Sequence, residues 1–372
     1  MKKLMCIASL ALPAVCAHAQ SSVTLYGIII SGVSYVHNSD GQSSQFRTTS
    51  FGSRWGMRGS EDLGGGLKTV FILENGYNSN NGGLAQGGRE FGRKAVVGLS
   101  SDTLGTVTLG RQFDPMVDLV QPLQANTVIG VFTAPGDVDN ADASIRIQNS
   151  VKWVSPTWGG VKAEALYGVG GVAGSATNGQ SYAAGLGYNK GSLGLGAGYL
   201  HIDNGTASLR GTATTTSTAD SLFGSAVNSA YSSAKAIEIV RAIATYQFGP
   251  VTVGTLGSFS DYEPDGASKF KTSEKYKVIS PFAIWQITAP LSTNIGYLYM
   301  KSSGASSATY HEAAFQVDYA LSKSTDVYSF IAYTHASGSN GLGAAQAVIG
   351  SLDQNAGKPS QVNINFSIRH FF

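Results

Sequence analysis

Charged residues that could act together gather in the first half of the chain. Arg54 and Arg58 are four residues apart, and the segment 113–145 contains five acids: Asp114, Asp118, Asp137, Asp139 and Asp142. Arginine stays charged at physiological pH and is more weakly hydrated than lysine. Guanidinium groups that face carboxylates create a fixed field, which orients dipolar solutes and discriminates between ions by sign. Chemistry of this kind breaks no bond.

A serine nucleophile is the second chemistry to weigh. Segment 334–341 reads Thr-His-Ala-Ser-Gly-Ser-Asn-Gly, and His335 and Ser337 share strand parity. A nucleophilic serine needs a base within hydrogen-bonding reach and a group that orients this base. The segment opens a Gly- and Ser-rich stretch, however, which favours a loop. We therefore expect no catalytic residue here.

Metal and cofactor sites are not indicated either. Beyond residue 19, five histidines are scattered along the chain without an i, i+4 pair, so no metal site is predicted. Glycine runs at 168–171 and 185–198 precede no helical segment, which a nucleotide-binding loop requires. We expect no cofactor.

The first nineteen residues have the features of a secretory signal. Two lysines follow Met1, an almost wholly apolar run follows over 4–15, and 17–19 reads Ala-His-Ala, a small-residue cleavage pattern. A lipoprotein signal ending at Cys16 is the alternative, disfavoured because valine rather than a small residue precedes this cysteine. We expect a signal peptide over 1–19 and a single domain over 20–372.

The expected mature chain is neutral and free of thiols. Both cysteines and two lysines lie in the signal, which leaves 23 basic residues against 23 acidic ones. Disulfides, cysteine-ligated zinc and a cysteine nucleophile are thereby excluded. A net charge of zero gives no indication of a nucleic-acid partner.

The remainder is predicted to be all-β. Glycine, serine and threonine are abundant, which disfavours helices, and no apolar run approaches the ~20 residues of a transmembrane helix. Period-two segments bounded by turn residues predict sixteen strands. Their expected ranges are 22–37, 52–60, 66–77, 91–101, 104–112, 146–154, 160–169, 180–190, 192–202, 236–248, 250–261, 275–288, 291–301, 308–321, 324–336 and 361–372.

Short and long connections alternate along this series. The long ones are expected at 38–51, 78–90, 113–145, 170–179, 203–235, 262–274, 302–307 and 337–360. In an up-and-down barrel every second connection lies on the same side, and outer-membrane barrels combine short periplasmic turns with long external loops. The pattern predicts a 16-stranded antiparallel up-and-down transmembrane β-barrel with both termini on the periplasmic side.

Alternation within the strands agrees with this fold. In the last strand, Val362, Ile364, Phe366, Ile368 and His370 share one face, and Gln361, Asn363, Asn365, Ser367 and Arg369 share the other. Such faces suit a lipid-facing exterior and a wet interior. A half-buried sheet of a soluble protein is the alternative, but it would not explain the alternating loops. The same parity turns Arg54 and Arg58 into the lumen.

Several motifs resemble a known family. Residues 22–27, Ser-Val-Thr-Leu-Tyr-Gly, resemble the first strand of trimeric Gram-negative porins, particularly the betaproteobacterial type. Residues 54–68, from Arg-Trp-Gly-Met-Arg-Gly to Gly-Leu-Lys, resemble their second strand, turn and third strand. Residues 109–112, Leu-Gly-Arg-Gln, resemble the strand that leads into their third loop. Phe372 resembles the C-terminal signal read by the outer-membrane assembly machinery.

This resemblance implies a general diffusion porin of the outer membrane. Such a protein is a homotrimer that contacts lipid and lipopolysaccharide and passes small hydrophilic solutes and ions through a water-filled channel. In the family the third loop folds into the barrel, so 113–145 is expected to form a constriction. The family's Pro-Glu-Phe-Gly-Gly loop signature is absent here, which leaves open the loop conformation and the acids that face the arginines.

The resemblance also adds two arginines to the expected constriction. Arg93 aligns with a constriction strand, although strict alternation from Val97 and Leu99 would turn it outward. Arg146 matches the arginine at which the third loop returns to the wall. With Arg54 and Arg58 these residues would form the positive side, opposite the aspartates. We therefore expect a weak preference for anions.

Two rival functions follow from the same residues. A substrate-specific channel or an adhesin is the first, but sugar-specific channels present aromatic tracks inside, whereas Tyr182, Tyr188, Tyr199 and Phe366 are expected to face mostly outward. An outer-membrane phospholipase that uses His335 and Ser337 is the second, but such enzymes are shorter barrels. A porin is not an enzyme, and this is the interpretation we favour.

Overall fold

The computed structural model describes residues 22–125, 130–175, 177–204, 220–352 and 354–372. The expected signal peptide, at 1–19, lies outside the described residues. So do Val128 and Ile129 of the expected constriction loop.

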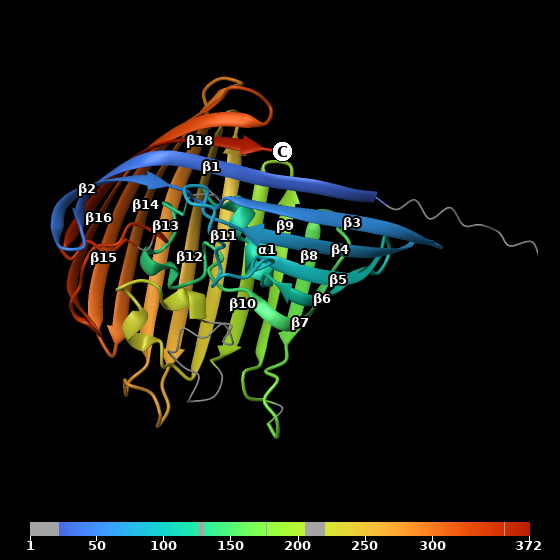
Figure 1. The fold of residues 1–372 in the computed structure, drawn as a ribbon, viewed down its shortest axis with the longest axis horizontal. Coiled ribbons are helices and arrows are strands. Elements are labelled where there is room, and N and C mark those ends of the chain that lie inside the picture. The colour runs from blue at the N-terminus through green and yellow to red at the C-terminus, as the bar shows by residue number, and fades with distance from the viewer. Residues whose placement is uncertain (1–21, 126–129, 176, 205–219, 353) are drawn as a thin grey trace, which may run out of the picture.

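One antiparallel sheet contains every named strand and closes on itself (Figure 1). Its strands are β1 (Ser22–Ser39), β2 (Gln42–Thr49), β3 (Arg54–Gly64), β4 (Leu67–Gly76), β5 (Lys94–Ser101), β6 (Gly105–Gln112), β7 (Ile147–Val154), β8 (Val161–Gly168), β9 (Ser181–Lys190), β10 (Leu193–Asp203), β11 (Ala236–Phe248), β12 (Val251–Glu263), β13 (Glu274–Gln286), β14 (Leu291–Gly304), β15 (Ser307–Ala320), β16 (Thr325–Asn340), β17 (Gly343–Ala344) and β18 (Ser360–Phe371). β1 pairs with β18, which closes the ring.

These eighteen segments make a sixteen-stranded wall. β2 and β3 pair with the two ends of β1 and so occupy one place in the wall. β17 has two residues and pairs only with the end of β16. The predicted sixteen-stranded antiparallel barrel is confirmed.

Two connections that were expected to be long are tight turns. β1 ends at Ser39 and β2 begins at Gln42, because Asp40 and Gly41 adopt φ values of 49° and 81°. Positive φ at both central residues is the preference of a type I′ hairpin, for which Asp-Gly is a strong signal. The expected loop 302–307 likewise shortens to two residues between β14 and β15.

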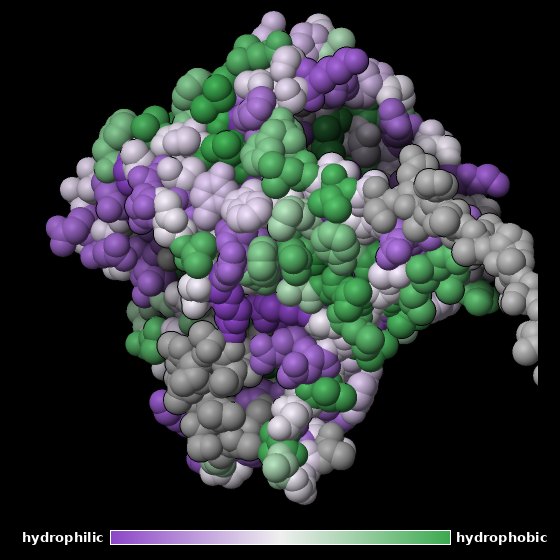
Figure 2. Space-filling view, turned by 45° about the vertical axis from the view of Figure 1, so that its right-hand side comes forward, coloured by the Kyte–Doolittle hydropathy of each residue, from purple (hydrophilic) through white to green (hydrophobic). Residues whose placement is uncertain are grey.

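The wall is inside-out compared with a soluble protein. On β18, Phe366 is 56% exposed on the outside, whereas its neighbours Asn365 and Ser367 are 1% and 0% exposed. Figure 2 shows apolar residues gathered in a broad area on one face of the molecule. Contiguous exposed apolar surface of this extent marks contact with lipid. The predicted lipid-facing exterior is confirmed.

Short helices lie in the connections. They are α1 (Pro115–Leu119) and the 3-10 turns η1 (Gln121–Leu123), η2 (Pro135–Asp137), η3 (Asp220–Phe223) and η4 (Ser229–Tyr231). Within the described ranges, no helix is both long and apolar enough to cross a bilayer.

Three loops fold into the barrel at its loop end, which is the end reached by β6, β10 and β16. Their described residues are 113–125, 130–146, 220–235, 341–352 and 354–359, and the buried side chains include Met116, Val138, Val227, Tyr231 and Val348. Figure 1 shows α1 enclosed by the strands. The inward fold predicted for the third loop is thus present, but the other two loops were expected to be external.

The inner wall under these loops also contains aromatic rings. Tyr262, Tyr276, Tyr310 and Tyr328 are at most 1% exposed. The outward placement expected for other aromatic residues is found at Tyr182 and Phe366, which are exposed. Aromatic residues therefore lie on both faces, and on the inner face the hydroxyls of Tyr262 and Tyr276 donate hydrogen bonds to the loop carbonyls of Val138 and Val227.

The C-terminal residue closes the turn end of the barrel, where the connections are short. Phe372 and Gly27 exchange backbone hydrogen bonds of 2.9 and 3.1 Å. The Phe372 ring lies directly over Gly27, where an added Cβ would approach the ring to 2.4 Å. A Cβ at position 27 would also approach the backbone oxygen of Arg54 to 2.8 Å, which favours glycine at this position.

Candidate constriction site

Buried acids give the 113–146 loop its shape. Asp114 caps α1 by accepting a 2.8 Å hydrogen bond from the Met116 amide, and its other oxygen accepts one from Asn140 Nδ2, also at 2.8 Å. Asp137 accepts hydrogen bonds from the amides of Asp142, at 2.8 Å, and Ser144, at 3.1 Å. Burial raises the pKa of Asp114, and it raises that of Asp137 well above the ordinary value.

The loop is held against the wall and the two other inward loops. Ser258 of β12 donates a 2.5 Å hydrogen bond to Asp139, and the Tyr262 hydroxyl donates one of 2.8 Å to the Val138 carbonyl. Gly136 is held from two sides, since its amide donates to the Gly350 carbonyl and its carbonyl accepts from Asn228, both at 2.9 Å. These contacts fix the inward position of the loop.

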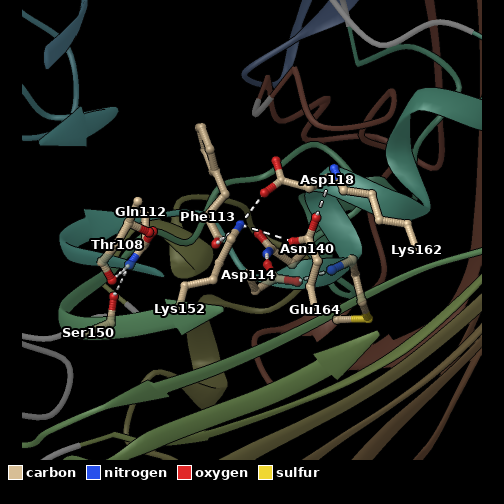
Figure 3. A network of polar contacts seen from close by, with 11 residues as sticks. Thr108, Gln112, Phe113, Asp114, Asp118, Asn140, Ser150, Lys152, Lys162 and Glu164 are labelled. Atoms are coloured by element: carbon tan, nitrogen blue, oxygen red, sulfur yellow. Dashed lines mark hydrogen bonds and ion pairs between the residues drawn. The ribbon is translucent and has the colours of Figure 1, made fainter. Parts of the chain in front are cut away.

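Asp118 lies in a charge network between α1 and the wall. Figure 3 shows it near Lys152, which also contacts Glu164 at 3.2 Å and donates a 3.2 Å hydrogen bond to the Phe113 carbonyl. Asp118 and Lys152 form an ion pair. Burial alone would raise the pKa of Asp118, but the Lys152 ammonium, assisted by Lys94, holds it below the ordinary value.

A cavity of about 680 Å³ remains between this loop, α1 and the wall of β2 to β5. Its charged lining residues are the cations Arg47, Arg54, Arg93, Lys94 and Arg146 and the acids Glu74, Asp118 and Asp142. Five cations against three acids leave a formal charge of +2. The cavity is therefore a positive compartment beside the inward loop.

Arg93 and Glu74 form a close ion pair in this cavity. Arg93 Nε lies 2.7 Å from Glu74 Oε1, and the Tyr26 hydroxyl donates a 2.9 Å hydrogen bond to Glu74 Oε2. Arg93 comes immediately before β5, which begins at Lys94. Strand alternation therefore does not govern its side chain, which explains why it enters the cavity although its parity predicted an outward orientation.

The Phe113 ring lies at the centre of three cations. The guanidinium carbons of Arg93 and Arg146 lie 5.4 and 5.2 Å from its centroid, and Lys94 Nζ lies 5.4 Å from it. Cations are attracted to an aromatic face by the ring quadrupole. The ring thus brings three like charges together without a formal charge of its own.

Arg146 and Asp142 complete the cavity where the loop returns to the wall. Arg146 donates a 2.9 Å hydrogen bond to the Ser144 carbonyl, and Ser351 donates one of 2.7 Å to Asp142. Burial and the neighbouring arginines lower the pKa of Arg146 to about 9, so it stays charged at neutral pH. Burial also raises the pKa of Asp142, against the opposing effects of Ser351 and Arg146.

The cavity brings together some of the expected site residues. Arg54, Arg93, Arg146, Asp118 and Asp142 line it. Arg58, by contrast, is exposed outside this lining, with its guanidinium 5.4 Å from the Tyr26 centroid. Asp114, Asp137 and Asp139 are buried in the loop and do not line the cavity.

Several residues of the site were not anticipated from the sequence. They are Arg47, Glu74, Lys94, Phe113 and Lys152. The inward orientation of Glu74 could have been predicted. Glu74 of β4 is the cross-strand partner of Gly56 of β3, and Gly56 shares the inward parity of Arg54. Arg47 had none, since its segment was expected to be a loop.

The histidine and serine weighed as a catalytic pair lie on β16. Both are exposed, and among the described residues no hydrogen bond joins His335 to Ser337. His335 is instead the cross-strand partner of His311. This geometry gives no support to a nucleophilic serine.

A closed sixteen-stranded barrel with an apolar exterior and a charged interior cavity defines a membrane β-barrel. The family model described as Gram-negative porin matches residues 6–339, and the chain belongs to this family. It is an outer-membrane protein.

Curated relatives match part of the chain. An outer membrane porin protein of Bordetella pertussis is 37% identical over 193 residues, covering 45% of this chain and 47% of the relative. Outer membrane porin protein 32 of Delftia acidovorans is 36% identical over 162 residues, covering 40% and 44%. The chain thus spans about half the length of the curated relatives it matches.

Solved structures match over nearly the whole chain. The anion-selective porin from Comamonas acidovorans superimposes with a TM-score of 0.72 at 22% identity, covering 95% of this chain and 100% of that one. OmpT of Vibrio cholerae gives a TM-score of 0.65 at 15% identity, covering 96% and 100%. At these identities the likeness concerns the fold.

Proposed function

We propose that this protein is a general diffusion channel that passes small hydrophilic solutes and ions with a weak preference for anions. The observation that carries this proposal is the cavity beside the inward loop, whose charged lining has five cations and three acids. An excess of fixed positive charge lowers the energy of an anion in a narrow wet passage. No catalysis is required of any residue, and we propose no enzymatic activity.

The constriction in this proposal consists of the 113–146 loop and the facing wall. Arg54, Arg93 and Arg146 provide the field, and Phe113 keeps two of them together with Lys94. A carboxylate in the position of Phe113 would also attract these cations, but it would cancel one of their charges. An aromatic ring avoids this loss, which supports a net positive constriction.

A homotrimer is part of the same proposal. A structure described as a trimer form of OmpT of Vibrio cholerae shares the fold at 14% identity, with a TM-score of 0.63. We further propose that the assembly machinery reads Phe372. This residue bonds to Gly27 beside the β1–β18 pair that closes the barrel, so it takes up this position only when the barrel is complete and can be read before then.

A bilayer recording tests the channel and its selectivity together. Protein purified in detergent is inserted into a planar bilayer, and the reversal potential is measured across a potassium chloride gradient. The proposal expects discrete conductance steps, which close in groups of three for a trimer. It also expects a reversal potential whose sign indicates that chloride permeates more readily than potassium. A lack of conductance would refute the channel, and a clear preference for potassium would refute the anion preference.

A further inference from the structure

Two lysines face each other on the outer wall near the loop end. Lys277 of β13 and Lys301 of β14 are direct cross-strand partners, and both lie on the outward faces of their strands. Like charges placed directly opposite each other destabilise a sheet, and their repulsion grows as the local dielectric constant falls. The pair is therefore costly beside lipid unless an anion lies between the two side chains.

The described part of the chain does not supply this anion. Lys301 Nζ contacts the hydroxyl oxygens of Ser307 and Thr309 at 3.2 and 3.0 Å, and neither is charged. Among the described residues, no carboxylate forms an ion pair with Lys277 or Lys301. The nearby Lys275, in contrast, lies 3.4 Å from Asp261. The lysine pair is thus open to an anion from outside.

A row of rings marks the level of the membrane surface next to these lysines. Tyr299, His311 and His335 are successive cross-strand partners, two residues nearer the middle of the wall. The Tyr297 hydroxyl lies 2.6 Å from His311 Nδ1. Girdles of amphipathic rings lie at the interfaces of membrane barrels. The lysines, about 7 Å further out, therefore lie at head-group level.

An apolar groove begins on the other side of this row. It has a volume of about 600 Å³, and its lining includes Ala283, Gly296, Ala313, Tyr297, Phe315 and Tyr333. Small residues leave space between the larger aromatic ones, and the lining residues are apolar or aromatic. A hydrocarbon chain fits such a groove, because its contacts require no hydrogen bond.

We propose that the outer wall of β13 to β16 binds a lipid that has phosphate on its head group. The phosphate lies between Lys277 and Lys301, and one acyl chain lies in the groove. The order of cations, rings and apolar groove matches the order of the parts of an amphiphile. Lipid A, the phosphorylated anchor of lipopolysaccharide, has this chemistry. A second copy of this chain related by a twofold axis through the lysine pair would add like charges there, which disfavours that occupant.

Native mass spectrometry of the detergent-purified protein, titrated with diphosphoryl lipid A, tests this proposal. Lys277→Gln combined with Lys301→Gln is expected to weaken binding about tenfold or more, since each basic residue near a membrane surface contributes measurably to anionic lipid binding. Ala313→Phe fills the groove without changing any charge and is expected to weaken binding as well. The matched control is Lys190→Gln combined with Lys323→Gln, two exposed lysines at the turn end, which should bind like wild type.

The outcomes separate this site from the channel. Bilayer conductance of each variant shows whether its barrel is intact. This conductance should equal that of wild type, and the expectation does not depend on the ion preference of the channel. The proposal is overturned if the variants at positions 277 and 301 bind lipid A as tightly as the control. It is also overturned if Ala313→Phe has no effect, because the lysines would then hold free phosphate equally well. Crosslinks between copies through this wall would assign it to a second subunit instead.

Discussion

Replacing Glu74 with glutamine removes one acid from the cavity and leaves its shape unchanged. The side chain lies 2.7 Å from Arg93 and 2.9 Å from the Tyr26 hydroxyl, and a glutamine carbonyl oxygen can still accept one of these hydrogen bonds. The formal charge of the lining rises from +2 to +3, because five cations then face two acids. We therefore expect a stronger preference for chloride over potassium.

The size of this effect follows from Coulomb's law. A unit charge about 8 Å from an ion in water changes the energy of that ion by about 0.5 kcal/mol. The change has opposite signs for chloride and potassium, so their ratio changes by about 1 kcal/mol, or about fivefold. At 0.1 M salt the Debye length is about 10 Å, and screening reduces the expected change to about twofold.

The assay is the reversal potential of single insertions across a chloride gradient, measured for wild type and Glu74→Gln. Glu61→Gln is the matched control, because Glu61 is an exposed acid on the same β3–β4 hairpin outside the cavity. The control should leave the reversal potential unchanged. A shift toward potassium in Glu74→Gln, or equal shifts in both variants, would contradict our assignment of the cavity as the selective region.

Three further predictions concern the loop. Phe113→Leu should reduce the chloride preference because the three cations lose the ring that holds them, and Phe113→Tyr should retain it; reversal potentials compare the two. The pKa of Asp142 is raised above the ordinary aspartate value of about 3.9, so Asp142 should become protonated in mild acid and remove one negative charge from the cavity. The chloride preference, measured as a reversal potential, should therefore rise as the pH falls in wild type and rise much less in Asp142→Asn. Asn140→Ala removes the hydrogen bonds that the Asn140 side chain makes with Asp114 and with the Ile145 amide. The loss should destabilise the folded loop by about 1–3 kcal/mol, and faster amide hydrogen exchange over 113–146 would reveal it.

Local sequence patterns predicted most of the wall. Period-two alternation and turn residues fix which face of a strand is apolar, and this pattern is readable residue by residue, as in Asn365, Phe366 and Ser367. The first connection was missed although Asp40-Gly41 is a strong hairpin signal. Its flanking segment 42–49 is polar and reads as a loop. The hairpin forms there because β2 finds a partner in β1.

The constriction could be predicted only in part. Arg54 lies within a strand, its parity predicts a side chain that faces the lumen, and it lines the cavity. Parity gave the wrong direction for Arg93, which precedes its strand and turns toward Glu74. The loop acids could not be sorted from sequence, since Asp118 and Asp142 line the cavity whereas Asp114, Asp137 and Asp139 satisfy backbone amides and side chains inside the loop.

The sequence by itself determined the membrane-facing barrel. Side chains alternate between the two faces of a strand, so the order of apolar and polar residues shows which positions contact lipid and which contact water. Only the tertiary structure decided what fills the barrel. The inward loops meet through contacts between residues far apart in the chain, such as Ser351 with Asp142 and Asn228 with Gly136. No local period encodes such contacts, so the shape and charge of the cavity exist only once the sheet has closed.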